Sequence, residues 1–482
     1  MKMFDGTSNE NQTAVTGAPA ATRSQIYAAV WRLHFYAGLF AIPFLLMLSV
    51  TGAAYLFRVD IENWLYRDLL RAPARTSPKL SGDEIVAAVQ GAFPGRSVAS
   101  YVPSFGPEES AKVALGGPSG GEHDHGTATS RRSGRRGGSL EVFVDPYDGR
   151  VLGSQVPNQR LMKRVRDFHG KLMMGPTGQA IVELAAGWMF ILLISGLYLW
   201  FPRKAGSIWG TFLPRLGKGQ RILVRDLHAV PAAYFAIALC FQIVSGMPWT
   251  FVNGKLLKGL ADSSPDGPSI AQPEHFHSQP PAAPAGSAQD WLGGMKAAAS
   301  PNSDTAHAGR RISLAHVVSI ADAEHVAHPF QVALPVGKTG VYSVRSLSTD
   351  PRNTYFLHLD QYSGQVVGRI SYSQLTPLAR GIAVGIAIHE GRMWGLPNRL
   401  AGLAAATGCF FIALMGGVLW WSRRPKGRLG APRRVPNFVL PRGVVLLSLI
   451  LGLVFPLVGA SMILLLLFDR LVLPRIPAAR PA

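Results

Sequence analysis

The chain has 482 residues, of which 48% are hydrophobic and only 16% charged, and its formal net charge is +20. Soluble domains contain about 25% charged residues, so this composition and several long apolar runs indicate a membrane protein rather than one large soluble core. Much of the positive charge lies in short loops beside the apolar runs, which argues against a nucleic-acid-binding surface. The expected partner is therefore a lipid bilayer and no nucleic acid.

Five apolar segments are long enough to cross a bilayer, which takes about 20 residues of helix. The first is too long for a cleavable signal and is expected to stay as an anchor. The predicted order is a disordered cytoplasmic tail (1–26), a first span (27–57), a first outer domain (58–168), a second span with a preceding interfacial segment (169–201), a cytoplasmic loop (202–226), a third span (227–250), a second outer domain (251–388), a fourth span with a preceding interfacial segment (389–421), a cytoplasmic loop (422–443), a fifth span (444–468) and a tail (469–482).

Lysine and arginine set the expected orientation. The loops 202–226 and 422–443 are rich in both, and Asp226 is their one acidic residue. Such loops stay in the cytoplasm, so the N-terminus is expected inside and the two large segments outside, in the periplasm of a Gram-negative cell. We therefore predict a multi-pass protein of a bacterial inner membrane.

The two halves of the chain repeat each other in the same order. At an offset of 194 residues, the matches include Leu33 and Leu227, His34 and His228, and Gly52 and Gly246. At an offset of 220 residues, they include His169 and His389, Gly196 and Gly416, and Trp200 and Trp420. Each half reads span, outer domain, span, which predicts parallel repeats related by a pseudo-twofold axis along the membrane normal. The fifth span has no counterpart.

Each outer domain is predicted as a small α+β unit. In the first copy, Ser81-Gly82-Asp83-Glu84 has the spacing of a helix-capping box, and alternating runs indicate strands. The predicted elements are a helix to about residue 93 with strands near 98–102, 111–115, 140–144 and 150–152, and then a helix at 313–325 with strands near 331–334, 341–344 and 355–359. Residues 117–138 and 262–288 are low-complexity inserts, typical of flexible loops.

Four histidines occupy repeat-equivalent positions beside spans: His34, His228, His169 and His389. Imidazole is a common axial ligand of haem iron, and an ionisable residue at a membrane boundary suggests a function. About 27 Å of helix separates His34 from Gly52, nearly the thickness of the hydrocarbon core. One histidine pair near each face could therefore hold one haem b each, with an electron route between them. The alternative is that these histidines are interfacial residues that solvate helix ends. Duplication copies a residue whether or not it binds iron, so the matched positions are compatible with both interpretations.

Other positions are weaker candidates. Two local clusters contain further histidines, His123 and His125 in the first and His275 and His277 in the second. Each cluster could bind a metal ion, or it could be part of a solvated loop. Thr51-Gly52, Ser195-Gly196 and Ser245-Gly246 are interpreted first as close helix packing and second as room for a flat macrocycle. Glu183 lies within the second span, where it could relay protons or face a polar cavity. The sequence identifies no catalytic residue.

The paired helices, strands and Asp-x-Tyr-x-Gly-x-Val turn resemble the PepSY domain. The Leu-His before one span and the His-Gly-Lys-Leu before a span ending in Tyr-Leu-Trp-Phe-Pro-Arg resemble the PepSY-associated transmembrane family over residues 27–425. That family includes iron-regulated inner-membrane proteins and ferric-siderophore reductases. The resemblance implies a haem-containing oxidoreductase that passes electrons to a ferric-siderophore or other periplasmic substrate.

No glycine-rich nucleotide fingerprint follows a predicted strand, so a reductase of this kind needs a separate cytoplasmic or membrane electron donor. The alternative is a non-redox, membrane-anchored PepSY protein that binds a periplasmic partner or metal, or regulates a peptidase. The fold class expected in either case is an α-helical membrane protein with five spans and two small α+β domains, built from a duplicated helix–domain–helix unit.

Overall fold

The computed structural model describes residues 20–118, 139–202, 208–262, 276–278, 310–425, 430, 442–467 and 471. By the density of its contacts the chain forms two compact units. The first, called here the helical unit, comprises Met1–Leu46, Leu184–Cys240 and Gly408–Ala482. The second, called the sheet unit, comprises Met47–Glu183 and Phe241–Thr407.

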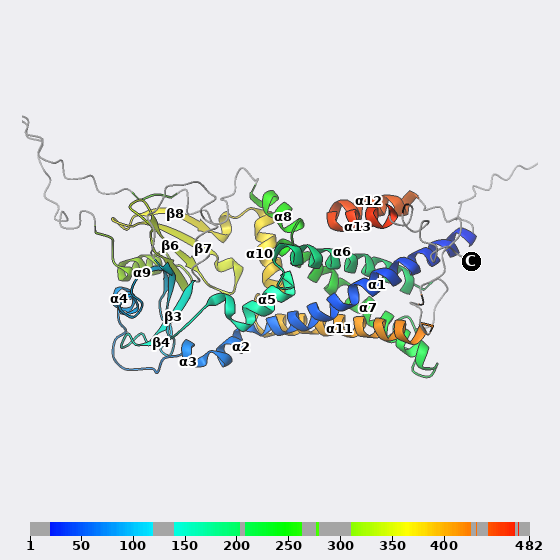
Figure 1. Cartoon of the computed structure of the whole chain (residues 1–482), viewed down its shortest axis with the longest axis horizontal. Coiled ribbons are helices and arrows are strands. Elements are labelled where there is room, and N and C mark those ends of the chain that lie inside the picture. Colours follow the sequence, from blue (N-terminus) through cyan, green and yellow to red (C-terminus); the bar gives the residue numbers. More distant parts are fainter. Residues whose placement is uncertain are drawn as a thin grey trace, which may run out of the picture. The chain divides into compact units, whose positions relative to one another are not determined.

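Among the described residues, four helices are long and apolar enough to cross a membrane (Figure 1). They are α1 (Ala20–Leu56), α6 (Gly175–Trp200), α7 (Gln220–Gly246) and α11 (Leu396–Arg423). Each contributes residues to both units. The first four predicted spans are therefore confirmed as membrane-capable helices, and the chain is a multi-pass membrane protein.

The predicted fifth span is wrong as a single helix. Residues 444–468 fall on two shorter helices, α12 (Arg442–Val454) and α13 (Pro456–Leu467), with a break at Phe455. Pro456 begins α13, because proline cannot donate the hydrogen bond that would continue α12. The two helices fold back on each other: a Cβ on Gly452 would lie 3.2 Å from the Cα of Gly459. The segment is apolar as predicted, but it does not form one continuous helix.

The hairpin of α12 and α13 packs against α6 within the helical unit. Val458 is buried and fills the space beside Gly187, where a Cβ would overlap its Cγ2. The Trp188 indole donates a 3.2 Å hydrogen bond to the Ser461 hydroxyl. Small residues allow this close approach of helices.

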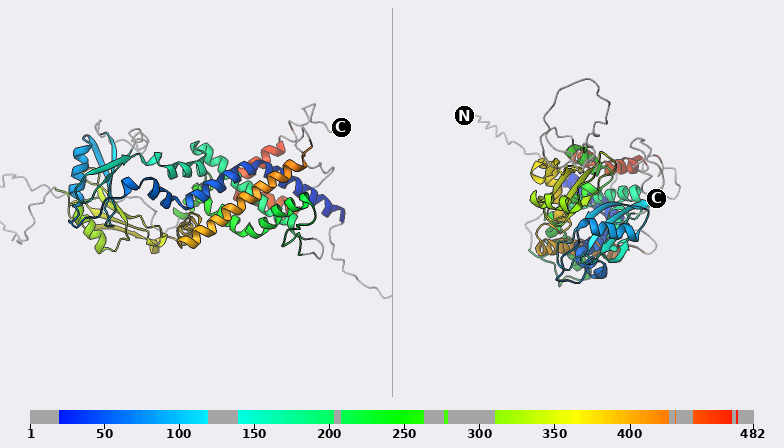
Figure 2. Two further views of the ribbon diagram at one scale, coloured as in Figure 1. Left: turned by 90° about the horizontal axis from the view of Figure 1, so that it is seen from below. Right: turned by 90° about the vertical axis from the view of Figure 1, so that its left-hand side faces the viewer.

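The eight strands form one continuous antiparallel sheet in the order β4-β3-β2-β1-β5-β6-β7-β8. Their bounds are β1 (Arg96–Val102), β2 (Ala111–Pro118), β3 (Leu140–Val144), β4 (Val151–Gln155), β5 (Phe330–Ala333), β6 (Val341–Ser346), β7 (Tyr355–Asp360) and β8 (Val366–Ser371). The copies join edge to edge where Ser100 pairs with Ala333, so the strands of one half lie beside those of the other (Figure 2). The sequence predicted two separate domains, and β8 was not among the predicted strands.

Helices α4 (Gly82–Ala92) and α9 (Leu314–Ala323) pack on the sheet and complete its core. Ser81 and Glu84 form the predicted capping box at the start of α4. The next residue, Asp83, accepts a 3.0 Å hydrogen bond from the Leu314 amide at the start of α9. One copy thus caps the helix of the other, which ties the two α+β copies together.

Short helices connect the sheet to the long helices. They are α2 (Arg58–Leu65), α3 (Arg67–Leu70), α5 (Leu161–Lys171), α8 (Asn253–Asp262) and α10 (Pro377–His389). The helices α5 and α10 precede α6 and α11, respectively, and end at Lys171 and His389, near where the interfacial segments were predicted to begin.

Candidate functional site

The imidazole of His34, on α1, is held by α6. Its Nδ1 lies 2.9 Å from the Ser195 hydroxyl. That hydroxyl donates its one proton to the Ile191 carbonyl at 2.7 Å, a side-chain bond to the preceding turn. It can therefore only accept from His34, whose proton must sit on Nδ1. The ring edge rests on Gly196, where a Cβ would lie 3.1 Å from Cε1.

The imidazole of His228, on α7, is held by α11 in the second half of the chain. Its Nδ1 lies 2.9 Å from the Ile412 carbonyl oxygen, which can only accept, so the proton again sits on Nδ1. Met415 stands at the repeat position of Ser195 and has no hydroxyl. The carbonyl of the preceding turn consequently bonds the imidazole directly. The ring edge rests on Gly416, 3.2 Å from where its Cβ would be.

His34 and His228 lie beside each other, with ring centres 6.2 Å apart and ring planes at 73°. We call these two residues the helical-unit pair. Each half of the chain supplies one ring and the helix that orients it.

His169, on α5, packs against α1. Its Nδ1 lies 2.8 Å from the Thr51 hydroxyl, which donates its own proton to the Met47 carbonyl at 2.7 Å. A Cβ on Gly52 would lie 3.3 Å from the His169 Cε1. This Thr-Gly pair therefore receives the ring as Ser195-Gly196 receives His34.

His389, the last residue of α10, packs against α7 in the same way. Its Nδ1 lies 3.0 Å from the Ser245 hydroxyl, and that hydroxyl donates to the Phe241 carbonyl at 2.6 Å. A Cβ on Gly246 would lie 3.4 Å from Cε1. The Trp249 ring lies 5.6 Å from the His389 ring, and its indole is 40% exposed, so it links the histidine to the surface.

His169 and His389 form the sheet-unit pair. Burial, and next the nearby His389, lower the pKa of His169 to about 4, so its imidazole is neutral at physiological pH. A neutral imidazole is the form that binds a metal ion.

All four imidazoles share one consequence of these contacts. Each is half-buried and carries its proton on Nδ1. Each Nε2 therefore keeps an unshared electron pair, and none of the four has a hydrogen-bond partner for it among the described residues. A metal-binding histidine needs this arrangement, in which the second nitrogen is fixed by a hydrogen bond and the first is free.

The structure describes one of the four histidines predicted in local metal-binding clusters. His123, His125 and His275 lie outside the described residues, and His277 is exposed. Within the described part of the chain, no group of three or more His, Cys, Asp and Glu side chains could hold a metal ion.

Glu183 is buried, and its carboxylate anchors the start of α8. It accepts hydrogen bonds from the Val252 amide (2.7 Å), the Asn253 amide (3.2 Å) and the Asn253 side chain (3.0 Å). Both oxygens are used in fixing the start of α8. The contacts favour an anchoring role over the proton relay considered from the sequence.

Sequence reasoning found the four histidines but not what fixes them. The Ser/Thr-Gly pairs were interpreted first as packing sites, and the Ile412 carbonyl and Trp249 were not considered. A signal was present: Thr51-Gly52 and Ser245-Gly246 keep the same 194-residue offset as His34 and His228. A conserved offset shows that two positions correspond, but it does not show which side chain each will meet.

A family model described as the PepSY-associated TM region matches residues 31–423. That range includes all four histidines and all of the residues that orient them, and it ends before the α12–α13 hairpin. No curated protein matches the chain.

Proposed function

Since the chain belongs to the family of PepSY-associated transmembrane proteins, we propose that it transfers electrons across a bacterial inner membrane through two haem b groups. The helical-unit pair would hold one haem and the sheet-unit pair the other. The single observation that carries the proposal is the common state of four imidazoles, each with Nδ1 donated to a fixed acceptor and Nε2 unshared.

The spacing of the helical-unit pair fits two ligands on one iron. Two imidazoles could hold one metal atom through bonds of about 2 Å if their ring centres lie roughly 6 Å apart. The centres of His34 and His228 are 6.2 Å apart. The glycine beside each ring removes the Cβ that would crowd it. The residues present therefore fit a haem with two histidine ligands.

Haem would supply one-electron chemistry, with a reduction potential that depends on its ligands and their hydrogen bonds. The chain's own residues fix the rings. The hydroxyls of Ser195, Thr51 and Ser245 accept from Nδ1, which makes Nε2 more electron-donating and prevents rotation of the ring. The apolar helices around the pairs would lower the local dielectric, which strengthens electrostatic interactions at the rings.

The route between the two pairs follows from the helices that serve both. Helix α1 supplies His34 to one pair and Thr51 to the other, and α7 supplies His228 and Ser245 in the same way. The lysine- and arginine-rich loops favour a cytoplasmic location for the helix ends that carry His34 and His228, and a periplasmic one for the sheet. Electrons from a cytoplasmic or membrane donor would leave on the periplasmic side.

The proposed acceptor is a ferric, siderophore-bound substrate at the sheet unit. The exposed Trp249 ring beside His389 offers a short path from that pair to the surface. Rapid-mixing measurements test this step: the dithionite-reduced protein should be reoxidised by a ferric siderophore and not by the same siderophore loaded with gallium. Equal rates with both would contradict the acceptor.

Visible spectroscopy of the purified protein tests the central claim. We expect a Soret band that shifts on reduction with dithionite, with about two haems per chain. His34→Ala and His389→Ala should each remove about one haem, whereas His316→Ala, at an exposed position on α9, should remove none. A colourless, folded protein from haem-replete cells would refute the proposal and leave a membrane-anchored binding protein as the alternative.

A further inference from the structure

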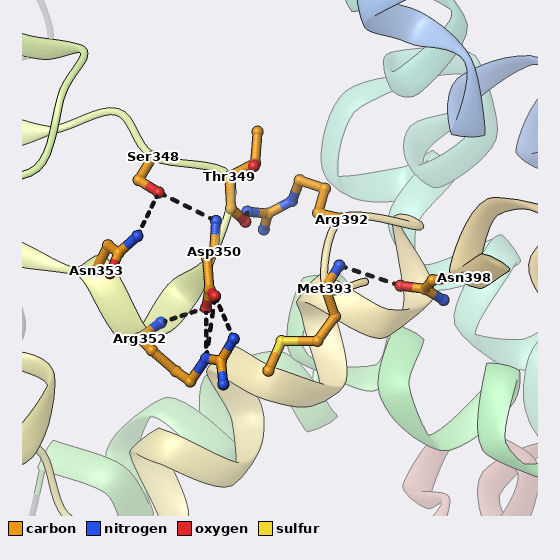
Figure 3. A network of polar contacts seen from close by, with 8 residues as sticks. All are labelled: Ser348, Thr349, Asp350, Arg352, Asn353, Arg392, Met393 and Asn398. Atoms are coloured by element: carbon orange, nitrogen blue, oxygen red, sulfur yellow. Dashed lines mark hydrogen bonds and ion pairs between the residues drawn. The ribbon is translucent and has the colours of Figure 1, made fainter. Parts of the chain in front are cut away.

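The turn that follows His389, residues 390–395, is held by a backbone hydrogen bond and by the side chain of Asn398. The Arg392 amide donates to the Ala387 carbonyl at 2.8 Å, which closes the end of α10. Asn398, buried at the start of α11, accepts from the Met393 amide at 3.1 Å (Figure 3) and donates to the Ile388 carbonyl at 3.1 Å. The backbone on both sides of His389 is therefore fixed by hydrogen bonds.

Glu390, next to His389, lies between two arginines. Its carboxylate accepts from the Arg392 Nε at 2.6 Å and lies 3.5 Å from Arg58. Arg58 begins α2, in the first half of the chain, and also donates to the Glu390 carbonyl oxygen at 3.4 Å. Both side chains of the Arg58–Glu390 pair are less than one fifth exposed, so water screens it only in part.

Arg392 reaches the sheet with the other end of its guanidinium. One NH group donates to the Thr349 carbonyl at 2.7 Å, in the connection between β6 and β7 (Figure 3). That connection is itself held in shape, because Asp350 pairs with Arg352 and the Ser348 hydroxyl accepts from Asn353 at 3.1 Å. A single side chain thus joins the sheet connection to the turn after His389.

The first half of the chain has no such link at the corresponding positions. At the 220-residue offset, Gly170 and Leu172 replace Glu390 and Arg392. The link is thus particular to His389 and is not inherited from the duplication. A feature that departs from the repeat at one of four equivalent histidines needs a reason of its own.

We propose that Arg392 is a positioning residue for His389, and that it couples the β6–β7 connection of the sheet to the orientation of this imidazole. The inference rests on the proposed function, because it concerns one of the four proposed ligands. A substrate that displaces residues 348–353 would, through Arg392 and Glu390, displace the turn that follows His389. Substrate bound at the sheet would thereby change the orientation of the His389 ring, from whose pair electrons are proposed to leave.

Substitution of Arg392 tests the link in the full-length protein. Arg392→Ala removes both contacts, whereas in Arg392→Lys one ammonium can reach Glu390 but cannot also form the second planar contact. The control is Arg369→Ala, at an exposed arginine on β8 whose ion pair with Glu324 does not involve the turn. Arg392→Ala and Arg369→Ala each remove an arginine–glutamate ion pair, at different places in the same unit.

Two readouts separate positioning from general stability. We expect the rate of hydrogen exchange in peptides covering 386–394 to rise about fivefold to tenfold in Arg392→Ala, because the variant loses one or two hydrogen bonds that hold the turn. Low-spin ferric haem signals in electron paramagnetic resonance should shift for one of the two haems only. Arg392→Lys should restore both readouts in part, and Arg369→Ala should change neither.

A failure of this inference can be told apart from a failure of the proposed function. Unchanged exchange in Arg392→Ala would overturn the inference, and so would faster exchange with unaltered signals from both haems. If the wild-type protein binds no haem, the proposed function fails. The exchange measurement then decides the link by itself, with faster exchange supporting it and unchanged exchange overturning it.

Discussion

Thr51 holds the Nδ1 of His169 at 2.8 Å across 118 positions of sequence, while its own proton goes to Met47 one turn earlier on the same helix. The hydroxyl is thereby left with only an acceptor role. This fixes the protonation of the imidazole without any charged partner. The same relation recurs at His34 and His389, which makes a hydroxyl on a neighbouring helix the shared device of three of the four histidines.

Replacing Thr51 by valine keeps the shape of the side chain and removes the acceptor. The His169 Nδ1–H then loses its partner, and the proposed haem ligand donates less strongly. We expect the midpoint potential of one haem to rise by roughly 40 mV, from about 1 kcal/mol for one hydrogen bond. Potentiometric titration would measure the change, and Thr51→Ser, which keeps the hydroxyl, should leave the potential near the wild-type value. A fall in potential would contradict the acceptor role.

Gly416 and its neighbour Gly417 provide a matched pair of substitutions on α11. A Cβ on Gly416 would lie 3.2 Å from the His228 Cε1 and 3.3 Å from its Nδ1, whereas a Cβ on Gly417 would meet only Ile42, at 4.0 Å. Gly416→Ala should therefore displace the His228 ring and lower the haem content by roughly half, if one of two sites is lost. Gly417→Ala should retain both haems. Equal haem content in the two variants would show that the ring is not held by this contact.

The two ends of the α12–α13 hairpin should lie on one side of the membrane. The helices have 13 and 12 residues, or about 20 and 18 Å, and neither reaches across a hydrocarbon core of about 30 Å. In a protein with Cys240 and Cys409 replaced, Arg442→Cys and Leu467→Cys should react with an impermeant maleimide from the same side. Trp394→Cys, in the turn before α11, should react from the opposite side. Labelling of the two hairpin ends from opposite sides would instead mean that the segment crosses the bilayer.

The contact between Gly187 and Val458 should stabilise the hairpin against α6. A Cβ on Gly187 would overlap Val458, so Gly187→Ala is expected to destabilise the protein by about 1–3 kcal/mol. Gly38→Ala is the control, because its Cβ would meet Leu192 at an ordinary 3.8 Å. Thermal unfolding in detergent should show a lower midpoint for Gly187→Ala alone. Haem content need not change, since neither glycine contacts a histidine.

Local sequence was sufficient for the long helices, most strands and the histidines. Hydropathy identifies α1, α6, α7 and α11 because a helix in a bilayer must be apolar along its own length. Alternation and turn residues identified seven of the eight strands. For example, Asp145 and Asp360 each accept from the amide two residues later in the predicted turns, a contact that depends only on neighbours. The repeat offsets identified the four histidines as one set.

By itself, then, the sequence determined which segments are apolar, which turn, and which four imidazoles correspond. Only the tertiary structure decided that β1 pairs with β5, that α12 folds back on α13, and that each imidazole meets a particular hydroxyl or carbonyl. The imidazole contacts join atoms 118 to 184 residues apart, as from Thr51 to His169 and from His228 to Ile412, and the pairing of β1 with β5 joins Ser100 to Ala333. Periodicity along a chain carries no record of distances between helices, and the protonation of an imidazole is set by the one atom it touches.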